Sequence, residues 1–243
     1  MIDIVIPMAG RGSRFVDGGY KKPKPFIDVL GKTMIENVLS NLKVDNARFI
    51  LIVRKEHIEN FPDTVAKIKN KYNVVFIPID MVTEGAACTV LFARKYINSN
   101  NSLIIANSDQ IIDIDIGDFV SDCSERNLDG SILTFKDPQK NKKWSFAKID
   151  SKGLVVEVKE KEPISDIATV GIYMFKKGKF FVENALDMIV RNDRVNNEFY
   201  VCPVYNYLIN NKKNIGIHNI PFDAMHGIGT PEDLKNFIKK KSK

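Results

Sequence analysis

The amino-terminal stretch constrains the fold of this chain more than any other. It begins with a short apolar run, Ile2 to Met8, and continues into a loop that contains Gly10 and Gly12. An apolar run that ends in a glycine loop is typical of a central parallel strand that delivers its carboxyl end to a ligand. The two glycines allow backbone N–H groups to approach an anion closely, and Arg14 and Lys24 add positive charge. The stretch therefore predicts a site for phosphate groups.

The glycine pair has several other interpretations. A dinucleotide-binding fingerprint requires a third glycine at the position where this chain has Phe15. A Walker-type loop requires Gly-Lys followed by Ser or Thr, and no such sequence follows. Gly10-x-Gly12 alone fits a plain strand-to-helix turn with solvated basic residues equally well. The sequence Pro23-Lys24-Pro25, a short distance further on, favours a ligand-binding loop.

The combination of Gly10-x-Gly12-x-Arg14 with Pro23-Lys24-Pro25 resembles the signature of the sugar-phosphate nucleotidyltransferases. These enzymes have a GT-A-like, Rossmann-type fold and join an NTP to a phosphorylated acceptor with release of pyrophosphate. The similarity extends through much of the chain, within a branch that is found with capsule-polysaccharide biosynthesis genes. It implies Mg²⁺ as cofactor, CTP as the favoured NTP, and L-glutamine phosphate, in a capsular phosphoramidate pathway, as the acceptor. A sugar 1-phosphate is the alternative acceptor.

The resemblance also implies roles for the residues of the amino-terminal loop. Arg14 and Lys24 would act in catalysis by stabilising the negative charge of the phosphates. Nucleotide contacts are implied for Met8, Ala9, Gly10, Arg11, Gly12 and Ser13.

Small residues also open the helix that we expect from Thr83 to Tyr96. Gly85 and Ala86 would let a flat base lie against the backbone, although a plain helix cap explains the same residues from the sequence alone. Related enzymes read the nucleobase in a short glycine-containing turn at this place. The resemblance therefore implies base contacts from Glu84, Gly85 and Ala86.

Asp109 is the strongest metal candidate in the chain. It follows the most apolar predicted strand, residues 103–107, at the carboxyl end where open α/β sheets bind ligands. A nucleoside triphosphate reacts as its magnesium complex, and Mg²⁺ prefers carboxylate oxygen. The resemblance aligns Asp109 with the family's acidic ligand and places Asn107 at the nucleotide, whereas an aspartate that merely closes a turn is the alternative. Asp113-Ile-Asp115 lies further on, in an alternating stretch that suits a short strand.

A second metal ligand is harder to assign. In better-known members of the family an aspartate precedes a Gly-Thr pair by two residues, and this chain has Gly227 at that position. Asp223 is the candidate substitute, with His226 as another. The remaining alternative is that Asp109, the triphosphate and water hold the metal alone.

An acceptor-binding half is predicted from a change of character after residue 136. Residues 144–150 and 155–159 form a predicted β-hairpin. The sequence Glu160-Lys161-Glu162-Pro163 resembles a Glu-Lys-Pro element whose lysine contacts the acceptor phosphate, with one residue inserted, and it implies a catalytic Lys161. For Trp144 and for the segment around Glu198, packing in the core is the alternative to a contact with the acceptor. Acceptor contacts are implied for Trp144, Gly171, Glu198 and Tyr200.

Strand and helix patterns alternate along the chain. The predicted strands lie near residues 49–53, 74–77, 103–107 and 130–135, and the predicted helices near 34–42, 55–72 with a break at Pro62, 116–126, 204–208 and beyond Thr230. The resemblance implies a further strand over 168–175 that lines the acceptor pocket. This order predicts an α/β fold with a Rossmann-like mixed, mainly parallel sheet flanked by helices and a smaller acceptor-binding portion. We expect a single nucleotidyltransferase domain over 1–243, with a nucleotide-binding half at 1–136 and an acceptor-binding half at 137–243.

Composition adds a few limits. The net charge is +6, but four lysines stand among the last five residues, so we expect a solvated, frayed tail rather than a nucleic-acid surface. The three cysteines are far apart and follow no metal or disulfide pattern. With no apparent leader or membrane-spanning run, we expect a cytoplasmic protein. The sequence leaves open whether the chain forms a homo-oligomer.

Two further functions remain open at this point. A glycosyltransferase of the same fold would cleave an activated sugar rather than make one, and would release no pyrophosphate. A protein that binds the nucleotide without turnover is the other alternative, motivated by Gly227 in place of the second metal ligand.

Overall fold

The computed structural model describes residues 1–242. The strands are β1 (Ile2–Pro7), β2 (Asp28–Val29), β3 (Lys32–Thr33), β4 (Ala47–Arg54), β5 (Val74–Ile79), β6 (Ser102–Ala106), β7 (Gln110–Ile112), β8 (Gly130–Lys136), β9 (Ser145–Ile149), β10 (Val155–Glu160), β11 (Ile167–Phe175), β12 (Ile215–Ile220) and β13 (Met225–Gly227). The α-helices are α1 (Ser13–Asp17), α2 (Met34–Asn41), α3 (Lys55–Asn60), α4 (Pro62–Lys71), α5 (Ala86–Leu91), α6 (Arg94–Ile97), α7 (Ile116–Glu125), α8 (Gly178–Val190), α9 (Val204–Asn210) and α10 (Pro231–Lys241). Two short 3-10 helices are η1 (Lys24–Phe26) and η2 (Phe222–Ala224).

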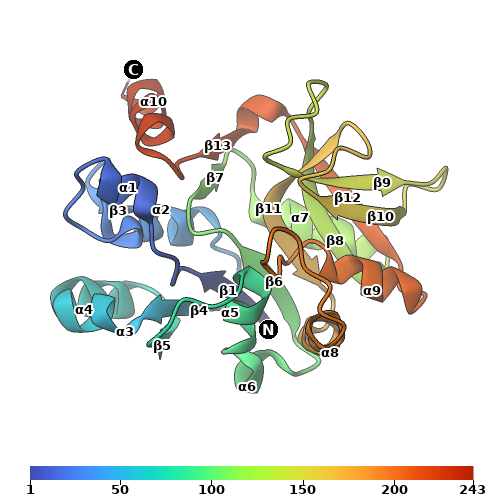
Figure 1. The fold of residues 1–243 in the computed structure, drawn as a ribbon, viewed down its shortest axis with the longest axis horizontal. Helices are drawn as coiled ribbons and strands as arrows, with labels where there is room; N and C mark the ends of the chain where they lie inside the picture. Colours follow the sequence, from blue (N-terminus) through green and yellow to red (C-terminus); the bar gives the residue numbers. More distant parts are fainter. Residues whose placement is uncertain (243) are drawn as a thin grey trace.

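A nine-stranded sheet forms the centre of the molecule. Its amino-terminal part consists of β6, β1, β4 and β5, which run parallel (Figure 1). The strand β11 pairs antiparallel with β6 and with β8, and it joins this part to β8, β12 and the antiparallel hairpin β9–β10. The predicted α/β fold with a mixed sheet and a parallel centre is confirmed. The predicted hairpin around residues 150–154 is confirmed as well.

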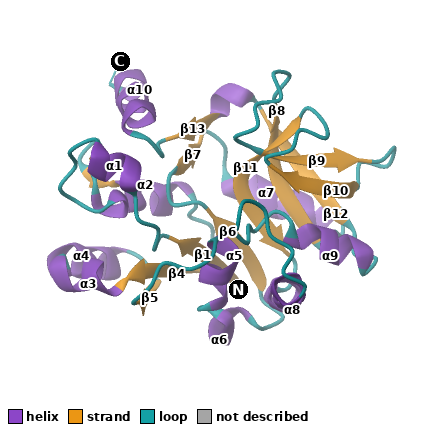
Figure 2. Cartoon of the chain, in the orientation of Figure 1, coloured by secondary structure: helices purple, strands orange, loops and turns teal. Residues whose placement is uncertain are grey.

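The central strand β1 is buried on both faces, and its sequence explains why. Successive side chains of a strand point to opposite faces. Ile4 and Ile6 accordingly join one apolar cluster together with α2, α4 and α7, whereas Val5 joins another together with α5, α8 and α9. Helices therefore cover both sides of the sheet (Figure 2). A continuous apolar run is what such a doubly covered strand requires.

The carboxyl-terminal helix α10 returns to the amino-terminal half of the molecule. Its side chains Leu234 and Phe237 pack with Phe15 of α1 in a third, smaller apolar cluster. Figure 1 shows α10 above α1, far along the chain but adjacent in space. The helix begins as predicted, because the hydroxyl of Thr230 accepts a hydrogen bond from the backbone N–H of Asp233 at 3.1 Å.

Several local predictions were wrong. The stretch Asp113-Ile-Asp115 is not a strand, because the short strand β7 ends before it and Asp115 instead caps α7. Helix α8 and strand β12 were not predicted. The helix expected over residues 83–96 divides into α5 and α6.

The lysine-rich end does not fray as expected, because α10 continues to Lys241, whose ammonium pairs with a carboxylate oxygen of Asp113 at 2.9 Å. Lys243 lies outside the described residues.

Candidate active site

The glycine loop forms one wall of a cleft at the carboxyl end of β1. Gly12 has a φ of 62°, a conformation that favours glycine, and a Cβ atom there would lie 3.2 Å from the Cβ of Lys24. The loop and η1 are therefore packed closely together. Between them lies a cavity of about 280 Å³, which we call the central cleft. Its lining comprises Pro7, Met8, Gly10, Gly12, Lys24, Pro25, Ala86, Asn107, Ser108 and Asp109.

Lys24 and Asp109 meet in the central cleft. The ammonium of Lys24 lies 2.5 Å from Oδ2 of Asp109, although 85 residues separate them in the chain. Asp109 is held from behind by the β7–β13 ribbon, because its carbonyl accepts a hydrogen bond from the N–H of Ile228 at 2.8 Å. The structure thus brings together the predicted catalytic lysine and the predicted metal ligand.

A second hollow, of about 240 Å³, adjoins the central cleft at Lys24. We call it the Arg14 hollow. It shares Gly12 and Lys24 with the central cleft, and Ser13 and Arg14 complete much of its wall. Arg11 is exposed and lines neither cavity. An anion that filled both spaces would contact the loop and the charges of Arg14 and Lys24 together.

A third hollow, of about 190 Å³, adjoins the central cleft at Gly10 and Ala86. We call it the Glu198 hollow. Its lining comprises Pro7, Ala9, Gly10, Val82, Thr83, Gly85, Ala86, Thr89 and Glu198. Ala9, Gly85 and Ala86 were predicted to contact the nucleotide, and the structure brings them together here. Glu198 was expected on the acceptor side instead.

The segment that carries Glu198 is clipped to the start of α5. Asn196 and Asn197 both have positive φ, which is typical of a tight two-residue hairpin turn. Phe199 then donates its N–H to the carbonyl of Glu84 at 2.7 Å and accepts from the N–H of Ala87 at 3.0 Å. Gly85 has a φ of 125°, and a Cβ atom there would overlap the backbone of Phe199. Glycine is therefore required for this approach.

The side chain of Glu84 does not line these cavities. Its carboxylate pairs with Arg194 at 3.0 Å, and it is 66% exposed. The cation of Arg194 in turn lies 4.4 Å from the ring centroid of Phe199. Glu84 therefore binds the Phe199 segment directly through its backbone carbonyl and indirectly through Arg194.

A fourth cavity, of about 260 Å³, lies beside the β9–β10 hairpin and is called here the hairpin pocket. It shares Ala86 and Asn107 with the central cleft, so the two cavities adjoin at these residues. Gly171 has a φ of 90° and allows β11 to approach Asn107, whose side chain a Cβ atom at this position would overlap. Its lining comprises Ala86, Asn107, Gln110, Lys143, Trp144, Ser145, Glu160, Thr169, Val170, Gly171, Tyr173, Tyr200, Val201 and Cys202. Three of the four predicted acceptor contacts, Trp144, Gly171 and Tyr200, lie in this wall.

Glu160 is a buried carboxylate of the hairpin pocket that we did not predict. The hydroxyl of Ser145, opposite it in the hairpin, donates a hydrogen bond to its carboxylate. Burial raises the pKa of Glu160 above its usual value, and the hydrogen bond from Ser145 opposes part of that shift. The alternation of side chains between the two faces of β10 could have predicted the burial of Glu160, since this residue lies on the same face as the buried Val158.

Lys161 is the predicted catalytic residue that lines none of the four cavities. Its ammonium donates a hydrogen bond to the hydroxyl of Tyr200 at 2.6 Å, and Tyr200 in turn donates to the carboxylate of Glu198. Burial, with the nearby charge of Glu198, raises the pKa of Tyr200 above its usual value. The tyrosine is therefore a neutral link between the lysine and the glutamate.

Asp223 is not brought to Asp109. It lies in η2, at the far end of β13, where the carbonyl of Ala224 pairs with the N–H of Asp113 at 2.8 Å. His226 points to the same end, because its Nε2 lies 2.6 Å from a carboxylate oxygen of Asp113. Within residues 1–242, no cluster of three or more His, Cys, Asp and Glu side chains is arranged to bind a metal. A single carboxylate suits a Mg²⁺ ion that takes its other ligands from phosphates and water.

The fold and these adjoining cavities define an α/β protein with a glycine loop and a row of cavities at the carboxyl edge of its parallel strands. The chain belongs to the nucleotidyl transferase family, whose model matches residues 4–219. None of the helices in residues 1–242 has the length and apolar character needed to span a bilayer.

Two relatives show sequence similarity over most of this chain. The chain is 24% identical over 197 residues to the bifunctional protein GlmU of Methanocaldococcus jannaschii, a match that covers 79% of this chain but only 44% of that protein. It is 23% identical over 211 residues to the UTP–glucose-1-phosphate uridylyltransferase AglF of Haloferax volcanii, covering 78% of this chain and 84% of the relative. The chain thus spans less than half the length of the GlmU relatives that it matches.

Solved structures share the whole fold. The nucleoside-diphosphate-sugar pyrophosphorylase from Vibrio cholerae RC9 is 26% identical and has a TM-score of 0.80, with 97% of this chain and 99% of that chain covered. The inositol-1-phosphate CTP transferase from T. maritima is 15% identical and has a TM-score of 0.74, with 98% and 96% covered, a likeness of fold alone.

Proposed function

We propose that the protein is a magnesium-dependent cytidylyltransferase that joins CTP to L-glutamine phosphate, releases pyrophosphate and serves the phosphoramidate of a capsular polysaccharide. The observation that carries nucleotidyl transfer is that the central cleft and the hairpin pocket adjoin at Ala86 and Asn107. Two phosphorylated ligands can therefore meet beside Lys24 and Asp109. The choice of CTP and of L-glutamine phosphate rests on the resemblance of the sequence to the capsule branch.

The reaction needs no general base. A phosphate oxygen of the acceptor attacks the α-phosphorus of the NTP in line, a new P–O bond forms, and the bond to the bridging oxygen breaks with its electron pair leaving on pyrophosphate. The attacking phosphate is already an anion at neutral pH. Catalysis can then come from position and charge alone.

Charge on the chain's own residues supports this chemistry. Gly12, Ser13 and Arg14 line the Arg14 hollow, where pyrophosphate would leave, and Lys24 lines both this hollow and the central cleft that contains Asp109. Asp109 would hold Mg²⁺, which supplies charge neutralisation of the triphosphate when it is bound. The Glu198 hollow, bordered by Gly85 and Ala86, is placed to take the base. The resemblance assigns the acceptor phosphate to Lys161.

A sugar 1-phosphate is the second candidate acceptor. Its support is a relative that is named for glucose 1-phosphate. Both acceptors would use the same two cavities and the same chemistry. The two acceptors differ in the chemical groups that they would present to the inner end of the hairpin pocket. At that end Glu160 and Ser145 form a buried hydrogen bond.

Pyrophosphate release in the presence of Mg²⁺ tests the proposal. Each of the common NTPs is combined with L-glutamine phosphate, phosphocholine, polyol phosphates and sugar 1-phosphates, and the variant Asp109→Asn serves as the negative control. Turnover with CTP and L-glutamine phosphate supports the full proposal, and turnover with a sugar 1-phosphate replaces its acceptor. If nucleotide binds but no NTP–acceptor pair turns over, a non-catalytic nucleotide-binding protein is favoured. If nucleotide-sugars bind and no pyrophosphate is released, a glycosyltransferase is favoured.

A further inference from the structure

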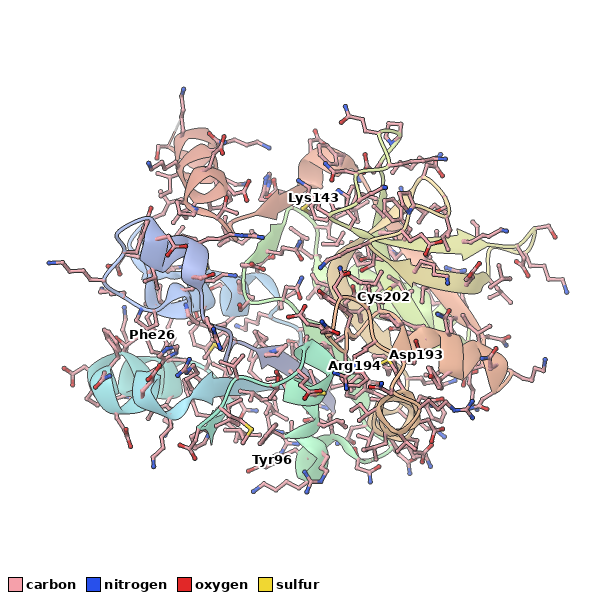
Figure 3. The ribbon with its side chains drawn as sticks, in the orientation of Figure 1. Phe26, Tyr96, Lys143, Asp193, Arg194 and Cys202 are labelled. Atoms are coloured by element: carbon pink, nitrogen blue, oxygen red, sulfur yellow. The ribbon has the colours of Figure 1, made fainter. Side chains whose placement is uncertain are left out.

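Two lysines stand at the same end of the β9–β10 hairpin, but only one of them faces the hairpin pocket. The N–H of Lys161 donates to the carbonyl of Trp144 at 3.0 Å, so the residues that follow β10 and precede β9 are neighbours. Lys143 lines the hairpin pocket, whereas Lys161 does not. In Figure 3, Lys143 lies on the side of the β9–β10 hairpin that faces β7 and β13.

The ammonium of Lys161 is already engaged. It donates to the hydroxyl of Tyr200 at 2.6 Å and lies 4.8 Å from the centroid of the same ring. Lys161 also has a φ of 57°, so the chain leaves the extended strand conformation at this residue. The residue that follows, Glu162, is the one inserted before the proline. Because of this insertion the chain departs from the family's Glu-Lys-Pro element, in which the lysine directly precedes the proline.

The ammonium of Lys143 is free to bind an anion. It lies 4.4 Å from the centroid of the Trp144 ring, and it forms no ion pair with any carboxylate of residues 1–242. A cation held over an aromatic face keeps its N–H donors available on the side away from the ring. The other charged side chain of the pocket wall is the buried Glu160, which would repel a phosphate from the inner end. The charges of the pocket therefore direct a phosphate toward Lys143.

We propose that Lys143, and not Lys161, binds the phosphate of the acceptor in the hairpin pocket. This inference rests on the proposed function for the identity of the acceptor, but the anion site itself does not depend on turnover. Lys161, linked through Tyr200 to Glu198, then acts as a positioning residue that joins the hairpin to the segment bordering the Glu198 hollow.

The tryptophan beside Lys143 provides a direct measurement. Trp144 is the only tryptophan of the chain, so its fluorescence reports on this pocket. Inorganic phosphate is titrated into the wild type and into the variants Lys143→Met, Lys142→Met and Lys161→Met, with Trp144 emission as the readout. Lys142 is the matched control, because it is the adjacent exposed lysine and does not line the pocket. Steady-state rates with varied acceptor and saturating NTP are measured in parallel.

We expect Lys143→Met to weaken phosphate binding and to raise the KM for the acceptor by about tenfold or more, the usual effect of one charge-assisted hydrogen bond, with the KM for NTP unchanged. Lys142→Met should change neither quantity. A loss of phosphate binding in Lys161→Met, with normal binding in Lys143→Met, would overturn the assignment. If no acceptor turns over but phosphate binding still depends on Lys143, the proposed function fails and the anion site stands.

Discussion

The ammonium of Lys24 lies 2.5 Å from Oδ2 of Asp109, with 22% of the lysine side chain and 23% of the aspartate side chain exposed. The pair neutralises two charges that the proposed reaction needs separately, one for the phosphates and one for Mg²⁺. In the proposed reaction an arriving magnesium triphosphate would exchange both partners at once: phosphate would take the place of the carboxylate at Lys24, and Asp109 would hold the metal instead of the ammonium. The ion pair thus holds both side chains in the cleft before the ligand binds.

Lys24→Ala should slow nucleotidyl transfer by about a hundredfold or more, since a preorganised charge at a reacting phosphate typically supplies about 3 kcal/mol. Rates are measured as pyrophosphate release at saturating substrates, with a thermal melt to verify the fold. Lys22→Ala is the control, because Lys22 pairs with Asp28 at the surface. A nearly normal rate in a folded Lys24→Ala variant would remove the role that we assign to this lysine.

Gly227→Asp should strengthen the use of Mg²⁺. A Cβ atom at Gly227 meets no heavy atom within 4 Å, whereas one at Gly229 would lie 2.5 Å from Oδ2 of Asp109. Gly227 ends β13 opposite Gln110, the residue that follows Asp109, so an aspartate at Gly227 would lie near the end of β7 that adjoins Asp109. We expect the Mg²⁺ concentration at half-maximal rate to fall roughly tenfold, because an added carboxylate increases the charge of the site.

The neutral control for this change is Gly227→Ala, which adds a Cβ atom without a ligand and should leave the Mg²⁺ requirement unchanged. Gly229→Ala should have the opposite effect, because its Cβ atom would displace the carboxylate of Asp109. A Gly227→Asp variant with the Mg²⁺ requirement of the wild type would show that the metal does not lie between β13 and Asp109.

The parallel centre of the fold was predictable from the sequence because each of its strands is a continuous apolar run. The side chains of Ile4, Val5 and Ile6 fill clusters on both faces, and such a pattern allows few other structures. Helix α8 was missed although its buried face includes Phe181, Ala185 and Met188, since neither a strong cap nor a glycine stop marks its ends. Local signals therefore identified the framework but not every element.

The site was predictable where backbone conformation depends on one residue type. Gly12 and Gly85 both need positive φ, and both border cavities. The directions of long side chains were not predictable, because tertiary partners decide them. Glu84 turns to Arg194, Lys161 turns to Tyr200, and neither partner is near in sequence.

Glu36 makes the stability of the fold depend on pH. Burial alone would raise its pKa, but hydrogen bonds from the N–H and hydroxyl of Thr33, with Lys67 and Lys71 nearby, hold the pKa below its usual value. A pKa that is lower in the folded state than in the unfolded state stabilises the folded protein when the pH is above the unfolded-state pKa of about 4.3. This stabilisation is lost as the pH falls through the folded-state pKa of Glu36.

Urea unfolding of wild type and Glu36→Gln tests this dependence. We expect the variant to be about 1–3 kcal/mol less stable at pH 7, because a buried hydrogen-bonded carboxylate is replaced by an amide. The difference should stay constant down to about pH 5 and shrink below about pH 4.3. Glu59→Gln, at an exposed helical position, should differ little from wild type at any pH. A difference that persists unchanged at pH 3 would contradict the expected titration.

Gly85→Ala and Gly10→Ala separate the two uses of glycine in this site. At Gly85 a side chain would overlap the backbone of Phe199 and force a φ of 125° on alanine, so the clip between α5 and the Glu198 segment should open. We expect a loss of about 1–3 kcal/mol, or about 2–4 °C in Tm for each kcal/mol, together with weaker NTP binding. At Gly10 a Cβ atom meets no heavy atom within 4 Å and projects from the wall of the central cleft. That variant should keep the Tm of the wild type and lose only NTP affinity, as measured by calorimetry; equal losses of Tm in both variants would mean that Gly10 serves the fold rather than the ligand.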